Sequence, residues 1–218
     1  MAENTLSALL VDAGNTLLQL REPVGETYAR LGRPYGVAGD AAAVGRRFGA
    51  AFRGWEGPRY QGDGRPFWRA VVAGSTGCAD LDYFEVVYAH YARPEAWTVA
   101  EGALEAFAAL RGRGVKVAVV SNWDDRLRGL LEVMGLMDAV DAAFISTELG
   151  VEKPDPAIYR LACEGLGVRP VEALHVGDHP EKDVAAARAA GCGALLYGAG
   201  LGSFRELATC QKVPPNSR

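Results

Sequence analysis

Regular alternation of two hydrophobic patterns over residues 99–197 constrains the fold of this chain most strongly. Segments with apolar side chains at helical spacing precede short runs of consecutive apolar residues, which are typical of buried strands. This alternation predicts right-handed βαβ units and a parallel sheet with helices on both faces. The expected helices are 101–112, 125–134, 156–166, 181–190 and a short one at 203–208; the expected strands are 115–120, 142–146, 173–177 and 193–197.

Another apolar run, residues 6–11, ends in Asp12 and is expected to pair centrally in this sheet. After it, four segments with helical spacing and no alternating strand pattern predict an inserted helical module. These segments are 22–35, 39–54, 66–74 and 82–92. The expected domains are an α/β core (1–18 and 99–210), a helical insertion (19–98) and a flexible tail (211–218).

The composition of the chain limits the kinds of partner that we expect for it. The chain has 218 residues and a mild net charge of −4, which gives no reason to expect nucleic acid or an anionic membrane surface. It has no apolar run of membrane-spanning length and no secretory signal, so we expect a cytoplasmic protein, or an organellar one if a transit peptide has been removed. The cysteines form no CxxC pair and are expected to be reduced. We expect a monomer or a weak dimer.

Polar residues follow the predicted strands at one common edge of the sheet: Asp12, Ser121 with Asn122, Lys153, Asp178 and Asp183. Such a set suggests phosphoryl transfer. Asp12, Asp178 and a backbone carbonyl of the first loop would hold Mg²⁺, which prefers oxygen ligands. Asp183 would hold a water on the metal or orient Lys153.

Asp12 would then attack phosphorus and form an aspartyl-phosphate that water later hydrolyses. Ser121 would donate a hydrogen bond to a phosphate oxygen, and Lys153 would stabilise the developing charge. Each residue alone also fits an ordinary turn or helix start. The substrate contacts are sought in the Gly- and Pro-rich loop 54–66, whose candidates are Arg59, Tyr60 and Arg65; a solvated surface loop explains this segment equally well.

In this order and at these strand ends, the motifs resemble those of the haloacid dehalogenase-like hydrolase superfamily. The resemblance covers about residues 6–200, and the helical block resembles that superfamily's helical-bundle cap. Residues 21–28, 97–99, 119–124 and 175–178 more narrowly resemble the hydrolase-domain-containing protein 3 branch, whose substrates are poorly assigned. The resemblance implies a Rossmann-like core with a cap, a small phosphorylated substrate, and the Gly14 carbonyl as a metal ligand.

Gly14 is also the main departure from that family. Phosphatases of the superfamily carry an aspartate at this position, which protonates the leaving oxygen and later activates water. General acid–base catalysis is typically worth about 10²–10⁴-fold, so a large loss of rate is expected unless another group substitutes.

Three explanations follow. The chain is a slow phosphatase for substrates with good leaving groups, or it is a catalytically impaired member that acts by binding, or it hydrolyses another bond, as the metal-independent dehalogenases of the superfamily do. The acidic pair Asp178 and Asp183 argues against a dehalogenase. A phosphonate-cleaving relative would need a cap lysine, and residues 19–98 contain none.

Overall fold

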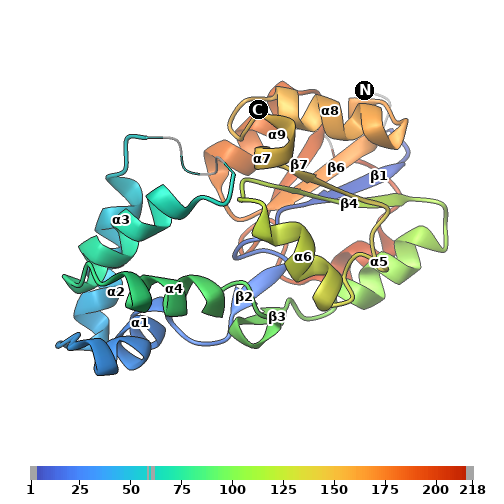
Figure 1. Ribbon diagram of the computed structural model, residues 1–218. Helices are drawn as coiled ribbons and strands as arrows, with labels where there is room; N and C mark the ends of the chain where they lie inside the picture. Colours follow the sequence, from blue (N-terminus) through green and yellow to red (C-terminus); the bar gives the residue numbers. More distant parts are fainter. Residues whose placement is uncertain (1–3, 58, 60–61, 215–218) are drawn as a thin grey trace. The chain divides into compact units, whose positions relative to one another are not determined.

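A five-stranded parallel sheet in the order β5-β4-β1-β6-β7 organises the computed structural model, which describes residues 4–57, 59 and 62–214 (Figure 1). Its central strand β1 pairs with β4 on one side and β6 on the other, and Leu10 lies opposite Ala118 and His175. The prediction of an α/β fold with the first strand at the centre is therefore confirmed. The strands are β1 (Ala8–Val11), β4 (Lys116–Ser121), β5 (Ala142–Ile145), β6 (Ala173–Gly177) and β7 (Gly193–Leu196).

Contacts between residues divide the chain into two units. The sheet unit contains Met1–Gln19, Val99–Trp123 and Leu131–Arg218, and the helical unit contains Leu20–Thr98 and Asp124–Leu130. The chain enters and leaves the helical unit through β2 (Leu18–Leu20) and β3 (Trp97–Val99), which pair as a two-stranded sheet. No strand was expected inside residues 19–98, because three-residue strands are too short for an alternating pattern to be visible.

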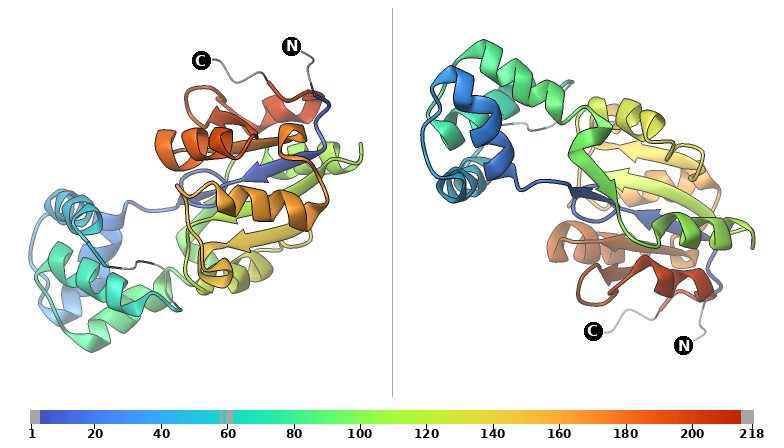
Figure 2. Two further views of the ribbon diagram at one scale, coloured as in Figure 1. Left: turned by 90° about the horizontal axis from the view of Figure 1, so that it is seen from above. Right: turned by 90° about the horizontal axis from the view of Figure 1, so that it is seen from below.

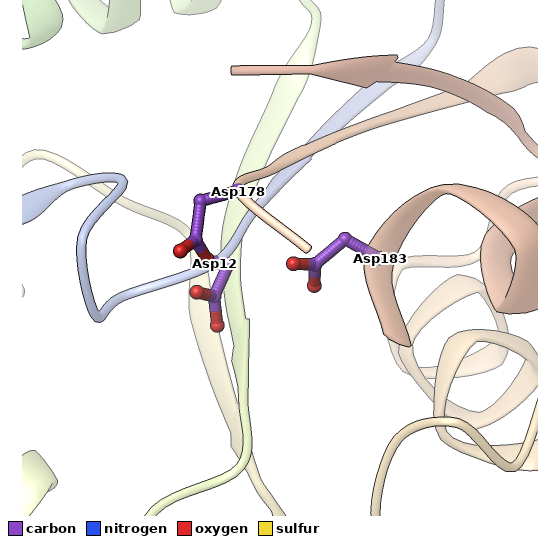
Figure 3. Close-up of side chains that lie close together, drawn as sticks. All are labelled: Asp12, Asp178 and Asp183. Atoms are coloured by element: carbon purple, nitrogen blue, oxygen red, sulfur yellow. The ribbon is translucent and has the colours of Figure 1, made fainter. Parts of the chain in front are cut away.

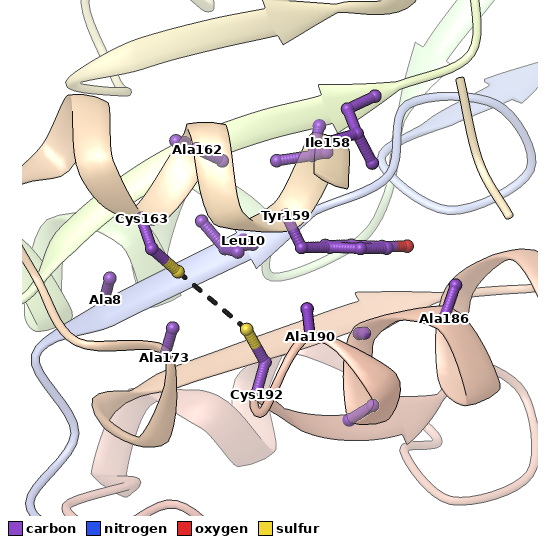
Figure 4. Packing of buried hydrophobic residues seen from close by; sticks show 14 residues of the cluster. Ala8, Leu10, Ile158, Tyr159, Ala162, Cys163, Ala173, Ala186, Ala190 and Cys192 are labelled. Atoms are coloured by element: carbon purple, nitrogen blue, oxygen red, sulfur yellow. Dashed lines mark hydrogen bonds between the residues drawn. The ribbon is translucent and has the colours of Figure 1, made fainter. Parts of the chain in front are cut away.

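Helices cover the sheet on both faces (Figures 1 and 2). On one face, α8 (Ala157–Leu166) and α9 (Ala186–Ala189) pack against Ala8 and Leu10 of β1 and their neighbours (Figure 4). In this buried layer the thiols of Cys163 and Cys192 lie 3.8 Å apart. On the other face, α5 (Ala103–Arg111) packs against the 3₁₀ helix η5 (Phe204–Thr209). Small apolar residues dominate the first face, so that the helix backbone can approach the strands closely.

The helical unit has a core of its own. Its four helices bury tyrosine, phenylalanine and valine side chains against one another, and the Tyr83 hydroxyl donates to the Tyr28 carbonyl at 2.8 Å. Asp40 and Asp80 cap the second and fourth helices by accepting from backbone N–H groups. The helices are α1 (Val24–Gly32), α2 (Ala41–Arg53), α3 (Arg65–Thr76) and α4 (Leu81–His90). In the part of the chain that the structure describes, no helix is both long and apolar enough to cross a bilayer.

Asp124 and Arg126 belong by their contacts to the helical unit, although the sequence placed them in the core. The Asp124 carboxylate is fully buried and pairs with the Arg126 guanidinium at 2.7 Å. It also accepts a hydrogen bond from the Trp68 indole N–H at 2.8 Å. Arg126 lies over the Tyr88 ring, with its guanidinium carbon 3.7 Å from the ring centre. The first turn of α6 (Arg126–Val133) is therefore held by partners from α3 and α4.

Two other details differ from the sequence prediction. The helix expected at 181–190 is a π-helix, η4 (Pro180–Ala185), followed by α9, and His179 caps it by accepting from two backbone N–H groups. Residues 211–214 of the expected flexible tail pack on the sheet unit, because Lys212 bridges to Thr5 and Val213 is buried against Gly193. Residues 215–218 lie outside the described part of the chain. The remaining elements are α7 (Ser146–Leu149), η1 (Arg33–Tyr35), η2 (Pro94–Ala96) and η3 (Pro170–Glu172).

Candidate active site

Asp12 follows the last residue of β1 and is only 6% exposed. Ser121 ends the neighbouring strand β4, and its hydroxyl donates to Asp12 Oδ1 at 2.9 Å. The Lys153 ammonium donates to the same oxygen at 2.7 Å. Both contacts use Oδ1, so they fix the carboxylate and leave Oδ2 without either of these two donors.

Lys153 is 3% exposed and bridges two acids, since its ammonium also lies 2.6 Å from Asp183 Oδ1. Burial lowers the pKa of Lys153, but the charges of Asp12 and Asp183 outweigh burial and raise it. The Asn122 amide binds the backbone of Lys153 in both directions, donating to its carbonyl and accepting from its N–H, each at 2.7 Å. Asn122 thus fixes the loop that presents the lysine.

Three carboxylates converge at the carboxyl edge of the sheet, as Figure 3 shows for Asp12, Asp178 and Asp183. One oxygen of each lies within 4.8 Å of the others. Asp178 is the most exposed of the three, and burial together with the charges of Asp12 and Asp183 raises its pKa. Gly177 is required beside this cluster, because a Cβ there would overlap the Asp183 carboxylate.

Both oxygens of Asp183 already have protein partners. Lys153 and His175 contact Oδ1, and the backbone N–H of His179 donates to Oδ2 at 2.9 Å. Burial raises the pKa of Asp183, but the hydrogen bond from His175 and the charge of Lys153 lower it well below its usual range. This arrangement favours an orienting role for Asp183 toward Lys153 over direct coordination of a metal.

The charges of the cluster fit a divalent cation. Three carboxylates and one ammonium leave two negative charges in a largely buried volume. Carboxylate oxygens are the ligands that Mg²⁺ prefers, and a bound divalent ion would neutralise the excess charge. The acidic cluster is therefore consistent with a metal site formed by Asp12 and Asp178, with the Gly14 carbonyl as a further predicted ligand.

Gly14, two residues after Asp12, lies beside the Trp123 ring. A Cβ at Gly14 would approach the Trp123 ring at 3.4 Å, the limit of an ordinary contact, and Gly14 does not have a positive φ. Asn15 does have a positive φ of 55°. Position 14 can thus accept a side chain, although this chain has none there.

Two of the three predicted substrate contacts, Arg59 and Arg65, belong to the helical unit. The Arg59 guanidinium carbon lies 5.0 Å from the centre of the Phe52 ring. Arg65 pairs with Asp63 at 2.8 Å and with Glu85, so its charge is balanced locally. Tyr60 lies outside the described residues. A role of these residues in substrate binding stays a prediction.

Sequence reasoning gave His175 no part in the site. It lies inside β6, is fully buried, and places Nε2 3.1 Å from Asp183 Oδ1. A signal was present, because a histidine interrupts the otherwise apolar run Ala173–Gly177. The backbone N–H of His179 could not be found in this way, since any residue supplies such a donor.

The fold and site define a class of α/β protein: a buried acid ends a central parallel strand, a lysine bridges it to a second acid, and a helical unit is inserted after that strand. The family model "haloacid dehalogenase-like hydrolase" matches residues 6–191. The chain belongs to the haloacid dehalogenase-like hydrolase family, which confirms the resemblance seen in the sequence.

Named relatives support this assignment. The chain is 35% identical over 206 residues to haloacid dehalogenase-like hydrolase domain-containing protein 3 of Bos taurus, covering 88% of this chain and 81% of that protein. It is 32% identical over 239 residues to phosphoserine phosphatase of Thermus thermophilus, covering 90% of each. The crystal structure of L-2-haloacid dehalogenase from Xanthobacter autotrophicus superposes with a TM-score of 0.68 at 25% identity, covering 88% of this chain and 77% of that one.

Proposed function

We propose that this protein is a Mg²⁺-dependent phosphatase that hydrolyses a small phosphorylated metabolite through an aspartyl-phosphate on Asp12. The observation that carries the proposal is the pair of hydrogen bonds to Asp12 Oδ1, from Ser121 at 2.9 Å and Lys153 at 2.7 Å, beside the Asp178 carboxylate. The phosphoserine phosphatase relative is compatible with such chemistry.

Each residue has a distinct part in this reaction. Asp12 Oδ2 attacks phosphorus while Oδ1 stays with Lys153, whose positive charge offsets the charge that develops on the phosphoryl oxygens. Ser121 turns its hydroxyl from Asp12 to a phosphoryl oxygen. When bound, Mg²⁺ supplies the positive charge that lets an anionic phosphate approach a carboxylate.

The leaving oxygen receives no proton from position 14. We therefore expect substrates whose leaving groups are already stable as anions, such as acyl phosphates or activated aryl phosphates. For these substrates the P–O bond breaks and the leaving group departs as an anion, so the 10²–10⁴-fold that acid catalysis typically supplies is not needed to form the aspartyl-phosphate. Position 14 also supplies no base for the later attack of water, so this second step is expected to be slow.

The test measures turnover of p-nitrophenyl phosphate and of phenyl phosphate, with and without Mg²⁺. Wild type is expected to show a far higher kcat/KM for the nitro compound than for the phenyl compound, because kcat/KM reports the step in which the leaving group departs, and Asp12→Asn is expected to abolish both activities. Gly14→Asp is expected to reduce the difference between the two substrates, because an acid now protonates the poorer leaving group. Full activity of Asp12→Asn would refute the nucleophile.

The same experiment separates the alternatives. A silent wild type with activity gained in Gly14→Asp identifies a catalytically impaired member that acts by binding, which Gly14 favours. Release of halide from a 2-haloacid without Mg²⁺ identifies a dehalogenase-type hydrolase. The negative charge of Asp178 and Asp183 disfavours a metal-independent dehalogenase, because this charge would not be neutralised without a bound cation.

A further inference from the structure

His175 is a buried polar residue whose presence the packing alone does not explain. Its side chain is fully buried on the face of β6 that α8 covers, and the Tyr159 ring meets it edge to face at 4.8 Å. Its Nδ1 has no hydrogen-bond partner among the described residues. An apolar side chain of similar size would avoid burying an unpaired nitrogen, so the imidazole must be retained for its other nitrogen.

The other nitrogen, Nε2, contacts the Asp183 carboxylate at 3.1 Å. A neutral imidazole carries one N–H, which either ring nitrogen can bear. With the hydrogen on Nε2, that N–H donates to Asp183 and only an acceptor is left unpaired. The opposite tautomer would bury an unpaired donor and place two acceptors against each other.

Asp183 is thereby held at both oxygens by groups from the strand and the following turn. His175 fixes Oδ1 from β6, and the His179 N–H fixes Oδ2 at 2.9 Å. Lys153 then takes its position from Asp183 Oδ1 at 2.6 Å and reaches Asp12 Oδ1 at 2.7 Å. Without His175, Oδ1 would be held by Lys153 alone, and the carboxylate could rotate and carry the ammonium away from Asp12.

We propose that His175 is a positioning residue, which donates from Nε2 to Asp183 and so fixes the carboxylate that holds Lys153 against Asp12. The inference rests on the proposed function, because it assigns the alignment of Lys153 to the phosphoryl-transfer step. His175 touches neither substrate nor metal in this account. Its removal should therefore lower kcat and leave KM unchanged.

The test compares His175→Leu, which has no donor, with His175→Gln, whose amide can still donate to Asp183. Leu174→Ala is the control, because Leu174 is the adjacent buried residue of β6 and points to the opposite face. With p-nitrophenyl phosphate and Mg²⁺, His175→Leu is expected to lose about 10–100-fold in kcat, the usual effect of removing such a supporting hydrogen bond. His175→Gln should recover most of this loss, and Leu174→Ala should lower Tm without changing kcat.

Equal kcat for wild type and His175→Leu would overturn the proposal, as would equal losses in the Leu and Gln variants. A second measurement does not depend on turnover. The ¹⁵N NMR spectrum of the wild-type imidazole should show a protonated Nε2 and an unprotonated Nδ1, and Asp183→Asn should shift the Nε2 signal. If wild type has no turnover, the proposed function fails, and the NMR result alone decides the contact: an Nδ1–H tautomer overturns it.

Discussion

Removal of the buried ammonium of Lys153 tests whether its charge, rather than the packing of its aliphatic stem, stabilises the folded site. Lys153→Met keeps the aliphatic stem and deletes the charge between Asp12 and Asp183, whose side chains are 9% and 2% exposed. Breaking a buried ion pair by removing one partner typically costs about 3–5 kcal/mol. Other donors remain, since Ser121 still contacts Asp12 and His175 still contacts Asp183.

Protonation of Asp12 or Asp183 limits the loss of stability in Lys153→Met. A carboxyl group with an ordinary pKa near 3.9 costs about 4 kcal/mol to protonate at pH 7 and about 1.5 kcal/mol at pH 5, at roughly 1.4 kcal/mol per pH unit. In Lys153→Met, Asp12 and Asp183 lose their cationic partner. Loss of a neighbouring positive charge raises the pKa of a carboxyl group in the folded state. The folded variant therefore binds protons that the unfolded chain does not bind at the same pH. Its deficit in stability therefore shrinks as the pH falls and grows as the pH rises.

We expect Lys153→Met to be destabilised by about 3–5 kcal/mol at pH 7.5 and by less than about 2 kcal/mol at pH 5, measured by urea denaturation in EDTA. Adding Asp183→Asn to this variant should restore part of the loss, because only one carboxylate then remains unpaired. Lys116→Met is the control. The Lys116 side chain is 52% exposed and its ammonium lies 3.8 Å from Asp141, so its loss should cost at most about 0.5 kcal/mol. A pH-independent loss in Lys153→Met, or one below about 1 kcal/mol at pH 7.5, would refute the charge argument.

Three further predictions concern the metal, the pH dependence and the helical unit. Mg²⁺ at about a hundred times its Kd should stabilise wild type by about 2.7 kcal/mol, seen as a rise in Tm over EDTA, and should not stabilise Asp178→Asn. In EDTA, the pKa of Asp178 is higher in the folded protein than in the unfolded chain, where it is about 3.9, so the folded protein binds this proton more tightly. The contribution of Asp178 to the free energy of unfolding is therefore greatest below about pH 3.9 and is lost as the pH rises through the folded-state pKa. In urea titrations from pH 4 to 8, Asp178→Asn should lack this decrease in the free energy of unfolding. Asp124→Ala removes the carboxylate that pairs with Arg126, whose side chain is 13% exposed, and should cost about 3 kcal/mol in urea denaturation. A cost near zero would show that water replaces the carboxylate.

The strands of the sheet could be predicted because each is a buried apolar run of four to six residues with a polar residue at its carboxyl end. The convergence of Asp12, Ser121 and Lys153 followed from topology, since parallel strands end at one edge. These contacts join residues up to 141 positions apart, yet they needed no knowledge of side-chain geometry to be anticipated.

Contacts that depend on the path of a loop or on a short strand could not be predicted in the same way. Asp124 lies three residues beyond the end of β4, and nothing in its neighbourhood indicates that its partner is Trp68 of the helical insertion. Likewise β2 and β3 have three residues each, which is too few for a period to be recognised. The sequence therefore predicts most of the helices and strands, but it does not predict which distant side chain will pair with a loop residue such as Asp124.

The side chains that hold Asp12, the proposed nucleophile, do so independently of position 14. Asp12 is held by Ser121 from β4 and by Lys153 from a later loop, and neither contact passes through position 14. In the proposed reaction, the lack of an acid at position 14 would therefore remove proton transfer to the leaving group without loosening the carboxylate of the proposed nucleophile. Because the backbone and Trp123 leave room for a side chain there, Gly14→Asp changes the chemistry while the support of Asp12 stays constant. The dependence of rate on the leaving group, compared between wild type and this variant, then measures what the missing acid would contribute.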